Sequence, residues 1–592
     1  MPACCIQRMT VSRWRSQKSS QGCDPLSKLR FSKADSFSGM LNNLLAKHKT
    51  IAAPGFNRWL VPPAALCIHL CIGMAYGFSV FWLHLTKAIG ITRSVQCPTS
   101  MGFFEKLVTT TCDWDRPLLG WMYTLFFVFL GSSAAIFGTW LERAGPRKAG
   151  VVSALCWCGG LVISAIGVYW HQLWLLWLGS GVIGGIGLGL GYISPVSTLL
   201  KWFPDRRGMA TGMAIMGFGG GAMIGSPLAA WLMKYFAGPD SVGVWETFLV
   251  LAGIYFLFML LGAFAYRLPP DGWVPKGTTS VGVVARKTLV ATPAAGRFVT
   301  VNQACKTYQF WLLWWVLCLN VSAGIGVIGM ASPMLQEILG GRLLGESLSF
   351  EKLDSGQLSQ LAVIGAGFTG LLSLFNIAGR FFWATLSDVL GRKITFSILF
   401  LLGSVLYAGV PWAGQAGNIS VFCGMFCLIL TMYGGGFAAI PAYVADLFGT
   451  QNVAAIHGRL LTAWSVAGIL GPVLVNYLNE FQFHSGVPRS AAYDQTMYLL
   501  AGLLAVGFFC NMAVRPVAEQ LFDGGADSSE HPAGINPKGA APPDSRSTPT
   551  PSHTRSNTLR GRCELVVFWL IVVGPLSWGF WMTLKQGWVL FR

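Results

Sequence analysis

Two neighbouring segments decide the fold of this chain: Asn376-Ile-Ala-Gly-Arg380 and Trp383-Ala-Thr-Leu-Ser-Asp-Val-Leu-Gly-Arg-Lys393. They close an apolar run that begins near Leu361, and at ~1.5 Å of helical rise per residue Arg380 lies about 12 Å before Asp388. A permanently charged guanidinium inside such a run is costly unless it faces a cavity, a partner or a ligand. The pattern therefore predicts a membrane helix on which Arg380 meets an anion.

The composition of the whole chain also favours a membrane protein. Apolar residues make up 53% of its 592 residues and charged residues only 11%, with 24 Trp and 39 Phe. Apolar runs of about 20 residues, long enough to cross a bilayer, recur along it. We therefore predict an all-α protein that crosses the lipid bilayer many times.

The net charge of +18 could indicate a nucleic-acid-binding protein, but the positions of the basic residues argue against that class. They collect in alternate loops between the apolar runs, which is typical of cytoplasmic loops. The sequence thus predicts no nucleic-acid partner, a location in the cell (inner or plasma) membrane and a cytoplasmic N-terminus. The 15 cysteines show no metal-ligand spacing, so no metal and no cofactor are expected.

An internal repeat divides the chain into two halves. Paired repeats of six membrane spans are typical of transporters. We therefore predict twelve spans in two pseudo-symmetric six-helix bundles. Three landmarks recur at offsets of 246, 246 and 245 residues: Gly145 with Gly391, Pro195 with Pro441, and Pro227 with Pro472.

These landmarks give the predicted domain organisation. The leading segment holds ten Lys or Arg against two Asp and no apolar core, and we expect it to be disordered, without a cleavable signal peptide. An additional C-terminal span would carry Arg592 to the outer face. The predicted parts are a cytoplasmic N-terminus at 1–58, six-helix bundles at 59–266 and 309–515, a cytoplasmic central loop at 267–308, a flexible linker at 516–562 and the additional transmembrane span at 563–592.

The loop at residues 91–117 contains two cysteines, Cys97 and Cys112. Its three basic and three acidic side chains fit the outer face of the membrane, where the surroundings are oxidising. A disulfide and a pair of free thiols remain equally open.

The two turns at residues 138–148 and 383–393 resemble the cytoplasmic signature that transporters of the major facilitator superfamily carry after their second and eighth spans. The first copy has a glutamate where aspartate is usual, but the negative charge is kept. The resemblance implies ion pairs that help to latch the cytoplasmic side, formed by Glu142 with Arg147 and by Asp388 with Arg392.

Further motifs resemble the oxalate/formate antiporter family, close relatives of the monocarboxylate carriers. The resemblance covers residues 59–515, and the terminal stretch 562–591 is similar to a small single-span protein that accompanies some bacterial members. The motifs are Gly191-Tyr192-Ile-Ser-Pro195, Lys201-Trp-Phe-Pro-Asp-Arg-Arg-Gly208, Met432-Tyr433-Gly-Gly-Gly436 and His457-Gly-Arg-Leu-Leu-Thr-Ala-Trp-Ser465.

The resemblance implies which residues bind the substrate. An arginine of the eighth span holds the carboxylate in these relatives; Arg380 matches it, and Asn376 matches a polar partner one turn earlier. Tyr192 and Tyr433 match positions that face the cavity, although a buried tyrosine can equally bond a backbone carbonyl. Arg380 could instead be the partner of a buried acid, but most of the other spans hold no Asp or Glu at a comparable depth.

Two histidines could carry a proton. His69 lies about 15 Å into the first span, near the membrane midplane. It is either a proton-exchanging or substrate-binding group or a neutral imidazole bonded to a neighbouring helix. His457 is the second candidate for proton coupling.

The eleventh span departs from the family pattern. Oxalate/formate exchangers have a lysine after Thr-Ala, whereas this chain has Trp464. A cavity with one fixed positive charge balances a monoanion better than a dianion. The substitution favours a small monocarboxylate such as lactate, pyruvate, formate or glycolate.

The expected function is therefore secondary active transport of a monocarboxylate by alternating access, with proton coupling or exchange, by a monomer. An oxalate/formate-type dicarboxylate antiporter is the alternative within transport. A nutrient receptor on a transporter fold, without net flux, is the alternative from another class. An enzyme is not expected, because the sequence shows no Ser/His/Asp set, metal cluster or phosphate loop.

Overall fold

The structure is a computed structural model that describes residues 43–91, 94–98, 100–114, 116–270, 273, 275, 297–345, 350–488, 491–523 and 556–587. Most of the segment predicted to be disordered, 1–42, lies outside the described residues. So do residues 524–555 of the predicted linker and the last five residues, with Arg592.

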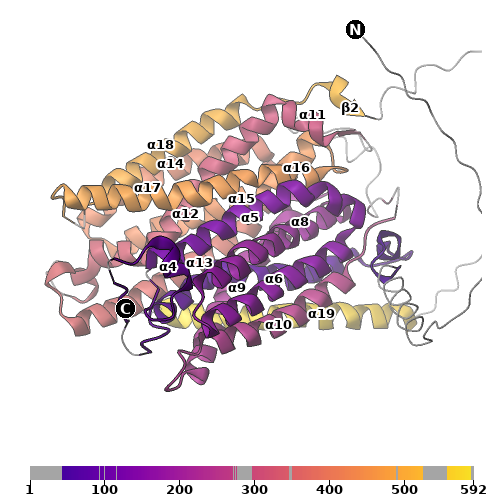
Figure 1. Cartoon of the computed structure of the whole chain (residues 1–592). Helices are drawn as coiled ribbons and strands as arrows, with labels where there is room; N and C mark the ends of the chain where they lie inside the picture. The colour runs from indigo at the N-terminus through magenta and orange to yellow at the C-terminus, as the bar shows by residue number, and fades with distance from the viewer. Residues whose placement is uncertain are drawn as a thin grey trace, which may run out of the picture.

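Two bundles of long helices lie side by side (Figure 1). The first half of the chain forms one bundle and the second half the other, which confirms the predicted fold class. The first bundle contains α2 (Val61–Ile72), η3 (Gly73–Phe81), α3 (Trp82–Leu85), α5 (Arg116–Ala144), α6 (Pro146–Tyr169), α7 (Leu173–Leu176), η4 (Trp177–Gly184), α8 (Gly185–Trp202), α9 (Arg207–Phe236) and α10 (Val244–Ala265). The second contains α12 (Tyr308–Leu343), α13 (Ser355–Leu390), α14 (Arg392–Ala416), α15 (Ile419–Phe448), α16 (Val453–Leu460), α17 (Thr462–His484) and α18 (Asp494–Ala513).

The helices have the length and apolarity of membrane spans. Within the described residues, 12 helices are long and apolar enough to cross a bilayer, and one of them is Cys563–Met582 near the C-terminus. Helix α13 is not among these 12, but its 36 residues pack against α9, α12 and α15 and complete the second bundle. The chain is a multi-pass membrane protein.

Glycines at two matched turns connect consecutive helices in the two halves. Gly145 joins α5 to α6 with φ +86°, and Gly391 joins α13 to α14 with φ +87°. An L side chain rarely adopts this backbone conformation, which explains why both turns hold glycine. We call the end of the bundles at which these turns lie the basic end.

A small cap closes the basic end of the second bundle. Strand β1 (Phe298–Val299) pairs antiparallel with β2 (Phe522–Asp523), and helix α11 (Val301–Lys306) leads into α12. The Asn452 side chain donates a hydrogen bond to the Val299 carbonyl at 3.1 Å. This cap ties the chain before α12 to the chain after α18.

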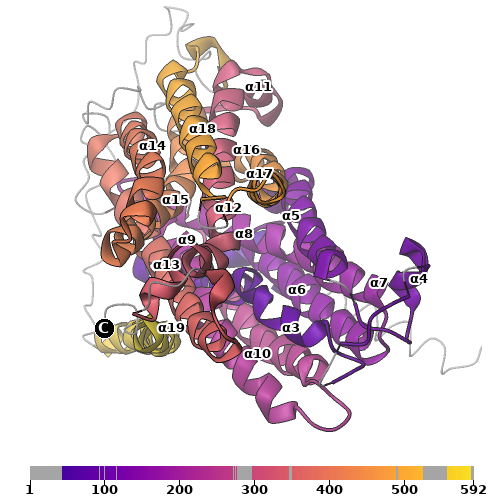
Figure 2. The same ribbon diagram turned by 90° about the vertical axis from the view of Figure 1, so that its left-hand side faces the viewer.

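The C-terminal helix α19 (Ser556–Gly587) packs along both bundles. It contacts α2 and α9 of the first bundle and α13 of the second, and Figure 2 shows it beside α13. Val572 is buried with Leu66 and Cys67 of α2, and Gly579 comes close to Met223 of α9. Helix α19 therefore covers the line along which α9 of the first bundle meets α13 of the second.

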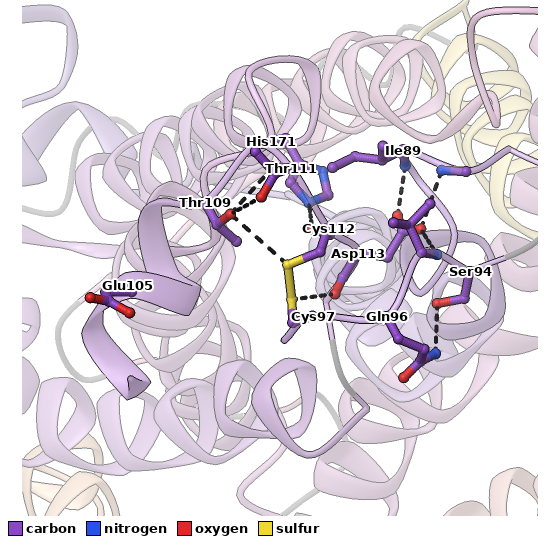
Figure 3. Close-up of a disulfide and its surroundings, with 12 residues drawn as sticks. Ile89, Ser94, Gln96, Cys97, Glu105, Thr109, Thr111, Cys112, Asp113 and His171 are labelled. Atoms are coloured by element: carbon purple, nitrogen blue, oxygen red, sulfur yellow. Dashed lines mark hydrogen bonds between the residues drawn. A yellow bond between two sulfur atoms is a disulfide. The ribbon is translucent and has the colours of Figure 1, made fainter. Parts of the chain in front are cut away.

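A disulfide closes the loop between α3 and α5. Cys97 and Cys112 are bonded, which resolves the question that the sequence left open (Figure 3). Next to the bond, the buried Asp113 carboxylate accepts hydrogen bonds from the backbone N–H groups of Ile89 at 2.6 Å, Gly90 at 3.2 Å and Val95 at 2.8 Å. The loop is compact and lies at the end opposite the basic end.

Candidate substrate site

Arg380 lies at the point where α13 meets α9. Its side chain is 0% exposed. Its Nε donates to Asn376 Oδ1 at 2.8 Å, and its Nη1 donates to the Ile215 carbonyl of α9 at 3.2 Å. The predicted pair of Arg380 and Asn376 is formed, because residues four apart lie on one helix face.

Glycines allow the neighbouring helices to approach this pair. A Cβ on Gly434 of α15 would overlap the Asn376 carbonyl, and one on Gly219 of α9 would lie 3.5 Å from Arg380 Nε. These small residues hold Arg380 between helices of both halves.

The charge of Arg380 has no acidic partner in the described part of the chain. Ion pairs there join other residues. Arg380 Nη2 and Asn376 Nδ2 are buried, and neither has a hydrogen-bond partner among the described atoms. A buried cation without a partner is costly, so these two donors are suited to bind an anion.

Three aromatic rings surround the guanidinium. Its Cζ lies 5.9 Å from the ring centre of Tyr76, 5.7 Å from that of Phe218 and 5.5 Å from that of Phe437. Such cation–π contacts stabilise a desolvated cation by about 1–2 kcal/mol each. The rings also exclude water, which strengthens any charge-assisted hydrogen bond made here.

The two predicted tyrosines join this cluster from α8 and α15. Tyr433 exchanges a hydrogen bond with Tyr76, their hydroxyl oxygens 3.1 Å apart, and thereby connects the two halves. The Tyr192 ring lies 5.9 Å from Phe218 and 5.6 Å from Phe437. Its hydroxyl is buried without a partner among the described residues.

The two histidines differ in their surroundings. His69 is 0% exposed; its Nδ1 contacts the Ala214 carbonyl oxygen, its Nε2 lies 3.2 Å from the Tyr192 carbonyl oxygen, and its ring stacks on Tyr192. His457 is buried 6.1 Å from the Tyr192 ring, and neither of its ring nitrogens has a partner in the described structure. Both histidines therefore border the aromatic cluster.

At the basic end, the predicted pair of the second half is formed. Arg392 Nη2 lies 2.7 Å from Asp388 Oδ1, and Arg392 Nε lies 2.9 Å from Asp446 Oδ2. Asp388 also accepts the backbone N–H groups of Gly208 at 2.7 Å and Met209 at 2.8 Å, at the start of α9. These N–H groups have no partner within α9, so the carboxylate of one half caps a helix of the other.

The predicted pair of the first half is not formed. Glu142 binds Lys201 at 2.9 Å instead of Arg147, and it accepts the backbone N–H of Ala454 at 3.2 Å, at the start of α16. Arg147 donates to the Leu44 carbonyl at 3.0 Å. The carboxylate still connects the two halves, but its basic partner comes from α8, which reaches the turn from elsewhere in the chain.

Sequence reasoning did not select four aromatic members of the cluster as binding residues: Tyr76, Phe218, Phe437 and Trp464. Tyr76 and Trp464 carry polar atoms inside apolar runs, which is a usable signal. Phe218 and Phe437 lack even that signal, since their role depends on which helices pack together.

Comparison with known proteins gives the family. The family model of the Major Facilitator Superfamily matches residues 64–372 and 357–590. The chain belongs to the major facilitator superfamily. It is therefore related to transporters, as the two matched turns predicted.

Curated relatives are distant but cover much of the chain. The oxalate:formate antiporter of Oxalobacter formigenes is 27% identical over 59% of this chain and 73% of its own length. Apicoplast pyruvate carrier 1 of Toxoplasma gondii is 25% identical over 76% of this chain and 87% of its own length. These matches bear out the predicted resemblance to oxalate/formate and monocarboxylate carriers.

A solved structure supports the fold. The proton:xylose symporter XylE matches with a TM-score of 0.51 and 16% identity, over 77% of this chain and 96% of its own. At this identity the likeness concerns the fold alone.

Proposed function

We propose that this protein is a secondary active transporter of a small monocarboxylate anion. The observation that carries the proposal is the buried Arg380, whose Nη2 has no protein partner in the described structure and lies between the two halves. A guanidinium fork can donate two parallel hydrogen bonds to a carboxylate and stays charged when buried. Asn376 Nδ2 and the Tyr192 hydroxyl are further donors beside it.

The mechanism we propose is alternating access. Substrate binds between the halves, the bundles rock about it, and the contacts at the basic end open and close in turn. Arg380 Nη1 already donates a hydrogen bond to a backbone carbonyl of α9, in the opposite half. An anion bound to Arg380 therefore changes the strength of the contact between α9 and α13. Substrate occupancy is thereby linked to the opening of the bundles.

Proton coupling is proposed through His69. A neutral imidazole has one N–H, yet both ring nitrogens of His69 face carbonyl oxygens, so the protonated ring satisfies both. Arg380 and His69 border the same aromatic cluster, and their like charges repel. A bound anion neutralises Arg380 and so favours the proton on His69, which would bring anion and proton in together.

The test is uptake of labelled lactate by proteoliposomes containing the purified protein. Arg380→Gln is expected to lower uptake about 100-fold, since it removes at least one charge-assisted hydrogen bond of up to about 3 kcal/mol. Arg380→Lys keeps the charge but loses the fork and should retain only a small part of the activity. Arg342→Gln, at an exposed position in α12, is the control.

Unchanged uptake by Arg380→Gln would overturn the assignment of Arg380 as the anion anchor. Binding of lactate without flux in the unmodified protein would support a receptor instead. Exchange of lactate for oxalate would favour the dicarboxylate antiporter, the activity in the printed name of the Oxalobacter relative.

Coupling needs a separate measurement. With an inward proton gradient, uptake by the unmodified protein should rise, and His69→Gln should remove this dependence. His48→Gln, at an exposed position, is the matched control. A gradient effect that persists in His69→Gln would exclude His69 as the proton carrier.

A further inference from the structure

Trp464 is the centre of the aromatic cluster. It lies near the start of α17 and is 0% exposed. Rings from both halves of the molecule surround its indole. The ring-centre distances to Trp464 are 4.5 Å for Phe437, 5.5 Å for Phe218, 5.6 Å for Tyr192, 5.8 Å for Phe127 and 6.4 Å for Tyr76.

The indole carries an unused hydrogen-bond donor. Trp464 Nε1 is buried, and no partner for it exists among the described residues. A buried tryptophan usually pairs this N–H, because leaving it unpaired costs about 1–3 kcal/mol. The N–H is therefore available to a ligand that enters the cluster.

Trp464 and Arg380 border the same three rings. Tyr76, Phe218 and Phe437 each lie within 6.4 Å of the Trp464 ring and within 5.9 Å of Arg380 Cζ. The cluster thus offers one cationic donor and one neutral donor around a shared apolar wall. A small acid with an oxygen next to its carboxylate matches this arrangement.

We propose that Trp464 selects the substrate: its Nε1–H binds the oxygen on C2 of a 2-oxo or 2-hydroxy monocarboxylate while Arg380 holds the carboxylate. This inference rests on the proposed function. The neutral indole satisfies a keto or hydroxyl oxygen but cannot neutralise a second carboxylate, which would be expensive in a dry site. A site built to hydrogen-bond a substrate oxygen rejects the analogue that lacks it, because its own donor is then left unpaired.

The experiment compares lactate with propionate, which has the same carbon chain without the C2 oxygen. In proteoliposomes the unmodified protein should transport lactate at least about 10-fold better than propionate, the effect of one buried hydrogen bond and its unpaired donor. Trp464→Phe keeps an aromatic ring but lacks the N–H. It should lower the lactate-to-propionate ratio about 10-fold, because it slows the uptake of lactate more than the uptake of propionate.

Two further variants distinguish a role of Trp464 in substrate selection from a role in stabilising the fold. Trp231→Phe, at an exposed position on α9, should leave the ratio unchanged. Trp464→His retains an N–H donor in a smaller ring and should restore part of the lactate preference. An equal loss of both acids in Trp464→Phe would assign Trp464 a structural role and overturn the proposal, as would an unchanged ratio.

A binding measurement on the unmodified protein does not depend on how a variant folds. Lactate and pyruvate should raise the apparent Tm at concentrations about 10-fold lower than propionate does. Equal stabilisation by propionate would also overturn the proposal. If Arg380→Gln abolishes uptake of all these acids while Trp464→Phe keeps the lactate-to-propionate ratio, the specificity inference fails and the proposed transport function stands. If Arg380→Gln transports these acids normally, the transport proposal itself fails.

Discussion

The two halves of the molecule meet along two seams that share a geometry but differ in their charges. In the first seam α5 packs against α16, and in the second α13 packs against α9. A glycine in each seam allows the two helices to approach closely. A Cβ on Gly458 would overlap the Ala134 carbonyl, and a Cβ on Gly208 would overlap the Ala384 carbonyl. In each, a carboxylate of one half caps a helix of the other.

The two seams differ in the number of hydrogen bonds and ion pairs that hold the two halves together. Asp388 accepts two backbone N–H groups and pairs with Arg392, which also reaches Asp446, and Asp446 binds Arg207 of the opposite half at 2.7 Å. Glu142 accepts one N–H across the seam, and its basic partner comes from its own half. The second seam also contains Arg380 and is covered by α19. We infer that the first seam opens more easily, while the second responds to substrate.

Among the tests of the two seams, the largest change should come from forcing the second seam apart. Gly208→Leu places a side chain where the Ala384 backbone already lies, and overpacking of this kind costs about 1–3 kcal/mol or more. The basic end should open, and transport should fall by at least about 10-fold. Hydrogen exchange should become faster in a peptide spanning residues 205–212.

The control for this change is Gly424→Leu. A Cβ at Gly424 in α15 meets no atom within 4 Å, so hydrogen exchange and transport should match those of the unmodified protein. If Gly208→Leu also behaves like the unmodified protein, the close contact at this seam does not exist in the functional state.

The next test compares the two capping carboxylates. Asp388→Asn should increase exchange at residues 205–212 about 10-fold, because hydrogen bonds to a charged group contribute about 1.5–3 kcal/mol. Glu142→Gln should increase exchange at residues 452–458 only about threefold, since it caps one N–H and is partly exposed.

Equal effects of these two substitutions would contradict the proposed difference between the seams. The double variant gives a further check. If the seams open independently, the effects of the two substitutions on the free energy of opening should add. If the seams open as one unit, these effects should not add.

A smaller effect is expected from changes in helix α19, which covers the second seam. A Cβ at Gly579 in α19 would lie 3.0 Å from Ile224 Cγ1 and 3.1 Å from the Met223 carbonyl oxygen, whereas a Cβ at Gly574 meets nothing within 4 Å. Gly579→Leu should therefore destabilise the packing of α19 by about 1 kcal/mol, and Gly574→Leu should not. The apparent Tm in detergent measures the difference.

The same pair of variants also sharpens the comparison of the seams. Gly579→Leu should increase hydrogen exchange in α9 and leave the peptide at residues 452–458 unchanged. Faster exchange at both seams would mean that α19 stabilises the whole molecule and not one seam.

The sequence predicts the scaffold well because its physical signals are local. Apolar runs give the spans, and the turns at Gly145 and Gly391 need a backbone conformation that glycine adopts. The pairing of Arg380 with Asn376 is also local, since four residues separate them on one helix.

Contacts between distant segments could not be predicted in this way. Glu142 forms an ion pair with Lys201 and not with Arg147. This choice of partner depends on the position of the end of α8 relative to the turn. The rings around Trp464 come from five helical elements, and all five are far from Trp464 in the sequence or on other helices. Such a cluster becomes visible only when the crossing of the helices is known.

The smallest predicted effect concerns the end of the molecule opposite the basic end. The disulfide-linked loop of the first half lies there. The His171 ring stacks on Trp114 with ring centres 4.1 Å apart. Its Nε2 lies 3.0 Å from the Cys112 carbonyl oxygen, beside the disulfide (Figure 3). Burial lowers the pKa of His171 below its ordinary value of 6.5, although the Cys112 carbonyl and the charge of Asp113 act in the opposite direction. The folded protein therefore keeps this ring neutral at a pH where the unfolded chain binds a proton.

Stability should accordingly fall as the pH drops through 6.5 toward the lowered pKa of the folded state, by at most about 1.4 kcal/mol per pH unit. His171→Asn, which tolerates the positive φ of 52° at this position, should remove this part of the pH dependence of the apparent Tm. His48→Asn, at an exposed position near the basic end, should retain it. Because His171 lies away from both seams, hydrogen exchange at residues 205–212 and 452–458 should not change with its protonation, and a change there would mean that the loop and the seams are coupled.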